Sequence, residues 1–100
     1  MRQHPYATEI RSLMRTLNKH GFTPVSVFDG EETEKVKNQS EAVDVILSVD
    51  DSSLYVKNAA GKTVKLYIVL GNDPGEAVCD HSDFDPLTVA MTEHYDRWSE

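Results

Sequence analysis

The residues best suited to chemistry gather in one stretch of the chain, GNDPGEAVCDHSDFDP, which runs from Gly71 to Pro86. It contains the single cysteine, Cys79, and a histidine two residues later, His81. A thiolate and an imidazole are both good zinc ligands, and together they can also supply a nucleophile and its base. Whether either chemistry is present depends on spacing.

The spacing does not fit a metal site. A structural zinc site usually combines two closely spaced ligand pairs from separate segments, and the other three histidines, His4, His20 and His94, are single and scattered. Three carboxylates could assist Cys79 and His81: Asp80, Asp83 and Asp85. A calcium loop needs acids at its first, third and fifth positions, whereas DHSDFD has them at the first, fourth and sixth. We predict no metal and no cofactor, with Cys79 and His81 as the only candidate ligands.

Catalysis by this pair is also disfavoured. On a strand, Cys79 and His81 would share a face about 7 Å apart, which is too far for a hydrogen bond. The sequence also lacks GxxxxGK[ST], GxGxxG, HExxH and GxSxG. We therefore predict no catalytic residues. The stretch is better interpreted as a turn over 72–75 and a short strand over 76–80 in which Cys79 is a small buried hydrophobe, followed by a helix cap.

Two helices are predicted near the ends of the sequence. Apolar residues recur at helical spacing early in the chain: Ile10, Leu13, Met14 and Leu17. The intervening positions, including Glu9 and Ser12, are polar, and Gly21 is placed to end the helix with Phe22 folding back on it. A second helix should begin at Asp85-Pro86 and bury the apolar positions that follow: Leu87, Ala90, Met91, His94 or Tyr95, and Trp98.

The middle of the chain predicts strands and one further helix. Residues 23–28 alternate as a strand, and EETEKVKNQ reads as a polar, flexible connection. Residues 40–48 fit a strand or a helix; we favour the helix, capped by Ser40, because it buries Val45, Ile46 and Val49 without leaving an apolar residue on its wet face. SSLYVKN and KTVKLYIVLGN then form a hairpin.

These elements predict one α+β domain over residues 1–100, with a small antiparallel sheet of about four strands. Their order is α-β-α-β-β-β-α. In the hairpin, Leu54, Val56, Val64, Leu66, Ile68 and Leu70 should face the core. The opposite face carries amphipathic side chains that make it a candidate contact surface: Tyr55, Lys57, Lys65, Tyr67 and Val69.

Charge constrains the partners. The chain has a net charge of −7, yet residues 1–21 hold four lysine or arginine side chains and one carboxylate. The acidic residues concentrate in two blocks, 29–51 and 73–100. Because such a surface repels phosphate backbones, we expect no direct binding of nucleic acid and instead a protein partner, basic where it meets the acidic blocks. The candidate residues for an acidic contact are Glu31, Glu32 and Glu34.

Three functions remain open. The first is a small acidic, non-enzymatic interaction module that binds a protein partner or itself as a homodimer. The second is a DNA-mimicking inhibitor of a nucleic-acid-binding protein, and the third is a small metal-binding protein or enzyme centred on Cys79 and His81. With one cysteine, no signal-like N-terminus and no apolar run longer than a strand, we expect a cytoplasmic protein without membrane contact.

The segment VDDSSLYVKN, together with the later KLYIVLGNDP and CDHSDF, resembles parts of small proteins from bacterial or phage genomes. This resemblance implies no activity and no site residues.

Overall fold

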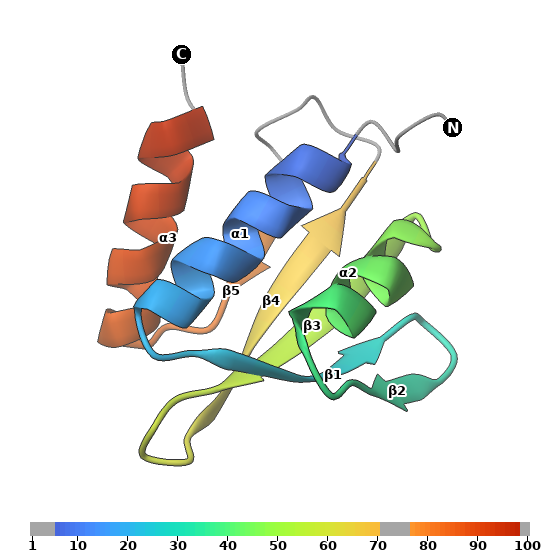
Figure 1. Ribbon diagram of the computed structural model, residues 1–100, viewed down its shortest axis with the longest axis horizontal. Helices are drawn as coiled ribbons and strands as arrows, with labels where there is room; N and C mark the ends of the chain where they lie inside the picture. The colour runs from blue at the N-terminus through green and yellow to red at the C-terminus, as the bar shows by residue number, and fades with distance from the viewer. Residues whose placement is uncertain (1–5, 71–76, 99–100) are drawn as a thin grey trace.

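The computed structural model describes residues 6–70 and 77–98. The elements are α1 (Ala7–Lys19), β1 (Thr23–Phe28), β2 (Thr33–Lys35), α2 (Gln39–Leu47), β3 (Asp51–Lys57), β4 (Thr63–Val69), β5 (Val78–His81) and α3 (Asp85–Trp98). The strands form one antiparallel sheet in the order β2-β1-β3-β4-β5. The three helices lie on the same face of this sheet (Figure 1).

The predicted α+β class and its antiparallel sheet are confirmed, but the strand count was too low. Residues 33–35 form β2, which pairs with β1 at the edge of the sheet, where a flexible connection was expected. All three β2 residues are exposed. A strand with no buried side chain has no apolar alternation, so its sequence carries no strand signal and its pairing with β1 defines it.

The end of α1 follows the predicted motif. Gly21 adopts φ +87°, and the Phe22 N–H donates to the Leu17 carbonyl at 2.9 Å. Phe22 is buried against the core. The left-handed glycine thus turns the chain from α1 into β1 and satisfies the last carbonyls of the helix.

Helix α1 packs between α2 and α3, and this buries more of it than the sequence pattern predicted (Figure 1). Glu9 and Ser12, which were expected on the exposed side, are 2% and 3% exposed, and Thr16 is buried with them. The reason is that α3 covers this side of α1: Arg97 and Trp98 of α3 both donate to the Ser12 hydroxyl.

The helix expected over 40–48 is confirmed as α2, with two corrections. Its N-cap is Asn38, whose side chain accepts a hydrogen bond from the Glu41 N–H, and not Ser40. The helix also turns a different face to the core: Ala42, Val43 and Ile46 are buried, whereas Val45 and Val49 are half-buried. Starting one residue earlier and ending at Leu47 leaves Val49 beyond the helix.

The predicted inward face of the hairpin is confirmed. Its buried residues are Leu54, Val56, Val64, Leu66, Ile68 and Leu70. They alternate with exposed or half-buried neighbours along β3 and β4. These side chains join those of α1, α2 and α3 in one core cluster, so one face of the sheet is fully used by the fold.

The last strand departs from simple alternation. The register shifts between Tyr67 and Ile68, which pair with Asp80 and Val78, so Cys79 is the extra residue. Ala77 and Val78 are therefore buried in succession, and Cys79 is exposed, which corrects its expected burial. The turn predicted over 72–75 lies outside the described residues.

Candidate functional site

The face of the sheet opposite the helices, here called the outer face, is the candidate site. Cross-strand register places the predicted contact residues on it: Tyr55, Lys57, Lys65, Tyr67 and Val69. None of the helices in residues 6–70 and 77–98 covers this face (Figure 1). The alternation of β3 and β4 therefore brings together five side chains that the fold itself does not bury.

One row of side chains crosses the outer face from edge to edge. Pairing aligns Thr33, Phe28, Ser53, Tyr67 and Asp80, one residue from each strand. Phe28 and Tyr67 are each 37% exposed, and they are two of the three large apolar side chains recorded as exposed among the described residues. Two partly exposed aromatic rings therefore lie in one row of an uncovered sheet face.

Tyr67 separates two shallow hollows in this face. One, of about 150 Å³, is lined by Phe28, Gly30, residues 51–53 and Tyr67; the other, of about 200 Å³, is lined by Lys65, Tyr67 and residues 80–82. The Tyr67 hydroxyl donates to Asp51 Oδ2 at 2.9 Å. This hydrogen bond, with a smaller contribution from burial, raises the pKa of Tyr67 above its ordinary value. The ring is thus held in place as a neutral donor at neutral pH.

Charge is distributed unevenly along the strands of the outer face. Lys35 and Lys65 lie in the row of Tyr55, and Lys57 lies one row further from the centre. Asp51 lies at the other end, beyond the Phe28–Tyr67 row. We call these two parts the basic half and the acidic half.

The turn between β1 and β2 extends the acidic half. Asp29 Oδ1 accepts hydrogen bonds from the backbone N–H groups of Glu31 and Glu32 at 2.9 and 2.8 Å. These two bonds lower the pKa of Asp29, so it stays ionised well into the acid range. The carboxylates of Glu31 and Glu32 are exposed at the same end of the sheet as Asp51.

Glu31, Glu32 and Glu34 do not form one row. Glu34 pairs with Val27, a core residue, so it lies on the helix side of β2, away from Thr33 and Lys35. Lys35 follows it directly along the strand. The three glutamates proposed for an acidic contact are therefore split between a turn and the opposite face of an edge strand.

Cys79 and His81 are placed apart by the bulge in β5. Cys79 is exposed, whereas His81 pairs with the core residue Leu66, and its Nδ1 lies 3.0 Å from the Ser82 carbonyl oxygen. Within the described part of the chain, no group of three or more His, Cys, Asp or Glu side chains is arranged to hold a metal ion. The structure does not bring a third ligand to this pair.

Two residues of the outer face were missed by sequence reasoning. Phe28 follows Val27, which is fully buried, so alternation along β1 was the signal that could have placed it on the outer face. Asp51 needs the register of β3 on β4 and the position of the Tyr67 hydroxyl, neither of which its neighbours in sequence reveal.

Comparison with known proteins yields no relative: no family model, curated protein or solved structure shows significant similarity to the chain. Among the helices of the described residues, none has both the length and the apolar character needed to cross a membrane.

Proposed function

We propose that the protein is an interaction module that self-associates through its outer face. The observation that carries this proposal is the uncovered sheet face with Phe28 and Tyr67, each 37% exposed, in the row that crosses all five strands. Aromatic side chains at the centre of a polar surface are the residues that most often dominate binding energy. Tyr67 is also fixed by its bond to Asp51, which reduces the entropy lost on binding.

The charge arrangement supports a second copy of the chain as the partner. A two-fold axis that lies between the two outer faces and runs across the strands, along the Phe28–Tyr67 row, places the basic half of one copy over the acidic half of the other. Lys57 and Lys65 then meet Asp51, Glu31 and Glu32 of the second copy. The aromatic rows meet at the axis, where they are removed from water.

In this arrangement the aromatic rings and the charged side chains contribute differently to binding. Burial of the Phe28 and Tyr67 rings supplies most of the affinity. The exposed charges at either end contribute mainly to orientation and to the rate of association, and salt screens them. The lysine stems also cover apolar surface beside Tyr55.

The first experiment measures the mass of the protein in solution against concentration by sedimentation equilibrium. The wild type should form dimers, and Phe28→Lys/Tyr67→Lys should remain monomeric at concentrations where the wild type is mostly dimeric. Lys37→Ala/Asp96→Ala, at exposed positions off this face, is the control. A monomeric wild type at millimolar concentration, with circular dichroism showing it folded, excludes self-association.

A charge-swap experiment tests the two-fold arrangement. Lys57→Glu/Lys65→Glu on one chain and Glu31→Lys/Glu32→Lys on another should each weaken self-association, and mixing the two variants should restore dimers by pairing opposite charges. Dimers that form equally well in every variant at low salt would remove the charge complementarity from the proposal. If only a basic partner protein binds, and duplex DNA competes with it, DNA mimicry replaces self-association.

A further inference from the structure

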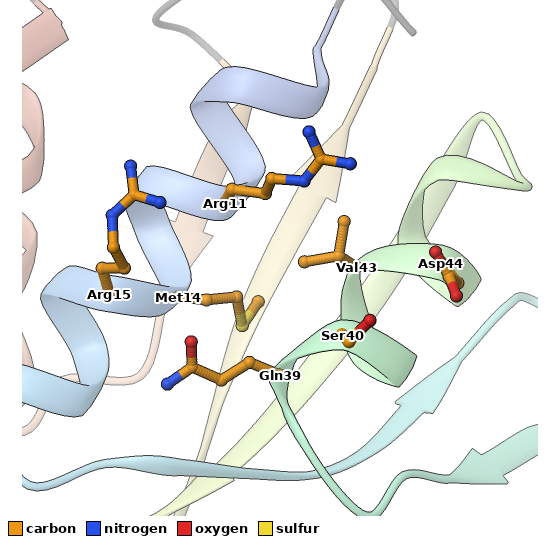
Figure 2. A pocket seen from close by; sticks show the side chains of 7 residues that line it. All are labelled: Arg11, Met14, Arg15, Gln39, Ser40, Val43 and Asp44. Atoms are coloured by element: carbon orange, nitrogen blue, oxygen red, sulfur yellow. The ribbon is translucent and has the colours of Figure 1, made fainter. Parts of the chain in front are cut away.

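A separate hollow lies between α1 and α2, on the helical side of the molecule (Figure 2). Its volume is about 360 Å³, within the range of small-molecule sites. Its lining comes from two helices: Arg11, Met14 and Arg15 of α1, and Gln39, Ser40, Val43 and Asp44 of α2. It shares no residue with the outer face.

Two arginines set the charge of this hollow. Arg11 and Arg15 are four residues apart, so they lie on the same side of α1 one turn from each other. Both are exposed, and neither has an ion pair or a hydrogen bond with any residue in 6–70 or 77–98. In Figure 2 the Arg11 side chain extends from α1 toward α2, and the Arg15 side chain extends along α1. Ten donor N–H groups of two guanidinium ions, five on each, are therefore available for a ligand.

The two arginines give the hollow a charge opposite in sign to the net charge of the chain. Carboxylates outnumber lysine and arginine by seven, yet Asp44 is the only carboxylate on the walls of the hollow. The formal charges of Arg11, Arg15 and Asp44 leave one positive charge in surplus. In an acidic protein this is a local reversal of sign, and it favours an anion over a cation.

The floor of the hollow is apolar. Met14 is 2% exposed and Val43 is 4% exposed, and they meet where the two helices pack. Gln39 and Ser40, in the first turn of α2, add an amide and a hydroxyl to the lining, and Figure 2 shows the Gln39 side chain extending toward α1. The Asn38 side chain accepts a hydrogen bond from the Glu41 N–H. The backbone N–H groups of residues 39 and 40 lie in the first turn of α2, where a helix offers its N–H groups no intrahelical partner. Positive donors thus surround an apolar base.

We propose that this hollow binds a small organic anion whose phosphate or carboxylate group lies between Arg11 and Arg15 and whose apolar body rests on Met14 and Val43. Planar guanidinium groups match the paired oxygens of both anions, and two of them can bind one phosphate from two sides. Ser40, Gln39 and Asp44 then contact polar substituents on the body of the ligand. The volume admits a single ring carrying the anionic group.

The test titrates the full chain with phenyl phosphate, inorganic phosphate and phenol. Binding of each probe is measured from the shifts of the backbone amide resonances. Phenyl phosphate should shift the resonances of residues 11–15 and 39–44 in a saturable way and bind at least about tenfold more tightly than either fragment. Benzoate should reproduce the pattern. Arg11→Gln/Arg15→Gln should weaken phenyl phosphate at least about tenfold, because two charge-assisted contacts are lost.

The matched control is Lys37→Gln/Lys62→Gln, which removes the same charge from exposed positions outside both the hollow and the outer face. It should leave phenyl phosphate binding unchanged. Equal weakening by both double variants would show a general charge effect and overturn the proposal. The absence of saturable shifts at about 10 mM probe would also overturn it, because that concentration is far above the dissociation constants of specific ligands. Binding of inorganic phosphate as tight as that of phenyl phosphate would overturn the role given to Met14 and Val43.

Discussion

His94 Nε2 lies 3.8 Å from Glu9 Oε2 in the contact between α3 and α1, and both side chains are buried. Glu9 Oε2 also accepts a hydrogen bond from the Ala77 N–H at 3.1 Å. Neither ring nitrogen of His94 has a hydrogen-bond partner among residues 6–70 and 77–98. One carboxylate therefore links α1 to α3 and to the start of β5 from within the core, where water does not screen it.

Replacing Glu9 with leucine should destabilise the protein by about 3 kcal/mol, because the Ala77 N–H loses its acceptor and His94 loses its neighbouring charge. Urea unfolding followed by circular dichroism measures this. Glu9→Leu/His94→Leu should be more stable than Glu9→Leu alone, since removing both polar partners avoids an unpaired imidazole in the core. A double variant less stable than the single variant would contradict this role of the pair.

Gly21→Ala should cost about 1 kcal/mol through backbone conformation alone. Gly21 has φ +87°, and no atom lies within 4 Å of the position that a Cβ would take. Clash with the rest of the fold therefore contributes nothing, and the cost comes from the Cβ against its own neighbouring backbone. Gly21→Asn should lose less, because asparagine tolerates the left-handed region better. Thermal unfolding of the three proteins gives the order; an alanine variant as stable as the wild type would show that α1 can end differently.

The stability supplied by Glu93 should disappear in acid. His20 Nε2 and Lys19 Nζ lie 3.1 and 3.1 Å from its carboxylate oxygens, and these hydrogen bonds lower the pKa of Glu93 below its ordinary value. A lowered folded-state pKa means that the stabilisation is complete above the ordinary value of 4.5 and is lost as the pH falls through the folded-state value. The stability difference between wild type and Glu93→Gln should therefore shrink from about pH 6 to about pH 3. A difference independent of pH would assign the effect to packing.

Ionisation of Tyr67 should depend on Asp51. The pKa of Tyr67 is raised because its hydroxyl donates to Asp51, so the contribution of this bond is present below the ordinary value of 10.0 and is lost as the pH rises through the folded-state value. Asp51→Asn should lower the pKa of Tyr67 toward that ordinary value. Ring resonances followed in an alkaline titration measure the change, with Tyr95, whose pKa is raised mainly by burial, as the internal control.

The sequence predicted the elements whose own side chains form a periodic pattern of apolar and polar residues. Alternation in β3 and β4 placed Tyr55 and Tyr67 on one face, and helical spacing with Gly21 defined α1 and its end. What remained hidden depends on neighbours: Thr33–Lys35 become a strand only beside β1, and Glu9 is buried only because α3 covers it. Periodicity describes one element at a time and does not report what packs against it.

The candidate sites divide in the same way. The outer face could be drawn from strand alternation, although Phe28 was missing from it. The hollow between α1 and α2 could not, because Arg11 and Ser40 belong to helices separated by two strands and only the fold brings them together. Its signal in the sequence was the excess of arginine and lysine in the first 21 residues of an acidic chain.

The position of α1 between α2 and α3 also sets an order of assembly. The contacts of α1 with α2 join neighbouring parts of the chain, whereas Lys19 meets Glu93 across 74 residues. A ribosome synthesises the residues of α2 and of the first three strands before those of α3. Helix α1 can therefore pack against α2 while its other side, with Glu9 and Ser12, is still exposed to solvent. Closing that long loop costs conformational entropy before its contacts form. Because the α3-facing side of α1 is polar, the partly synthesised chain presents little apolar surface there to chaperones or to other unfinished chains.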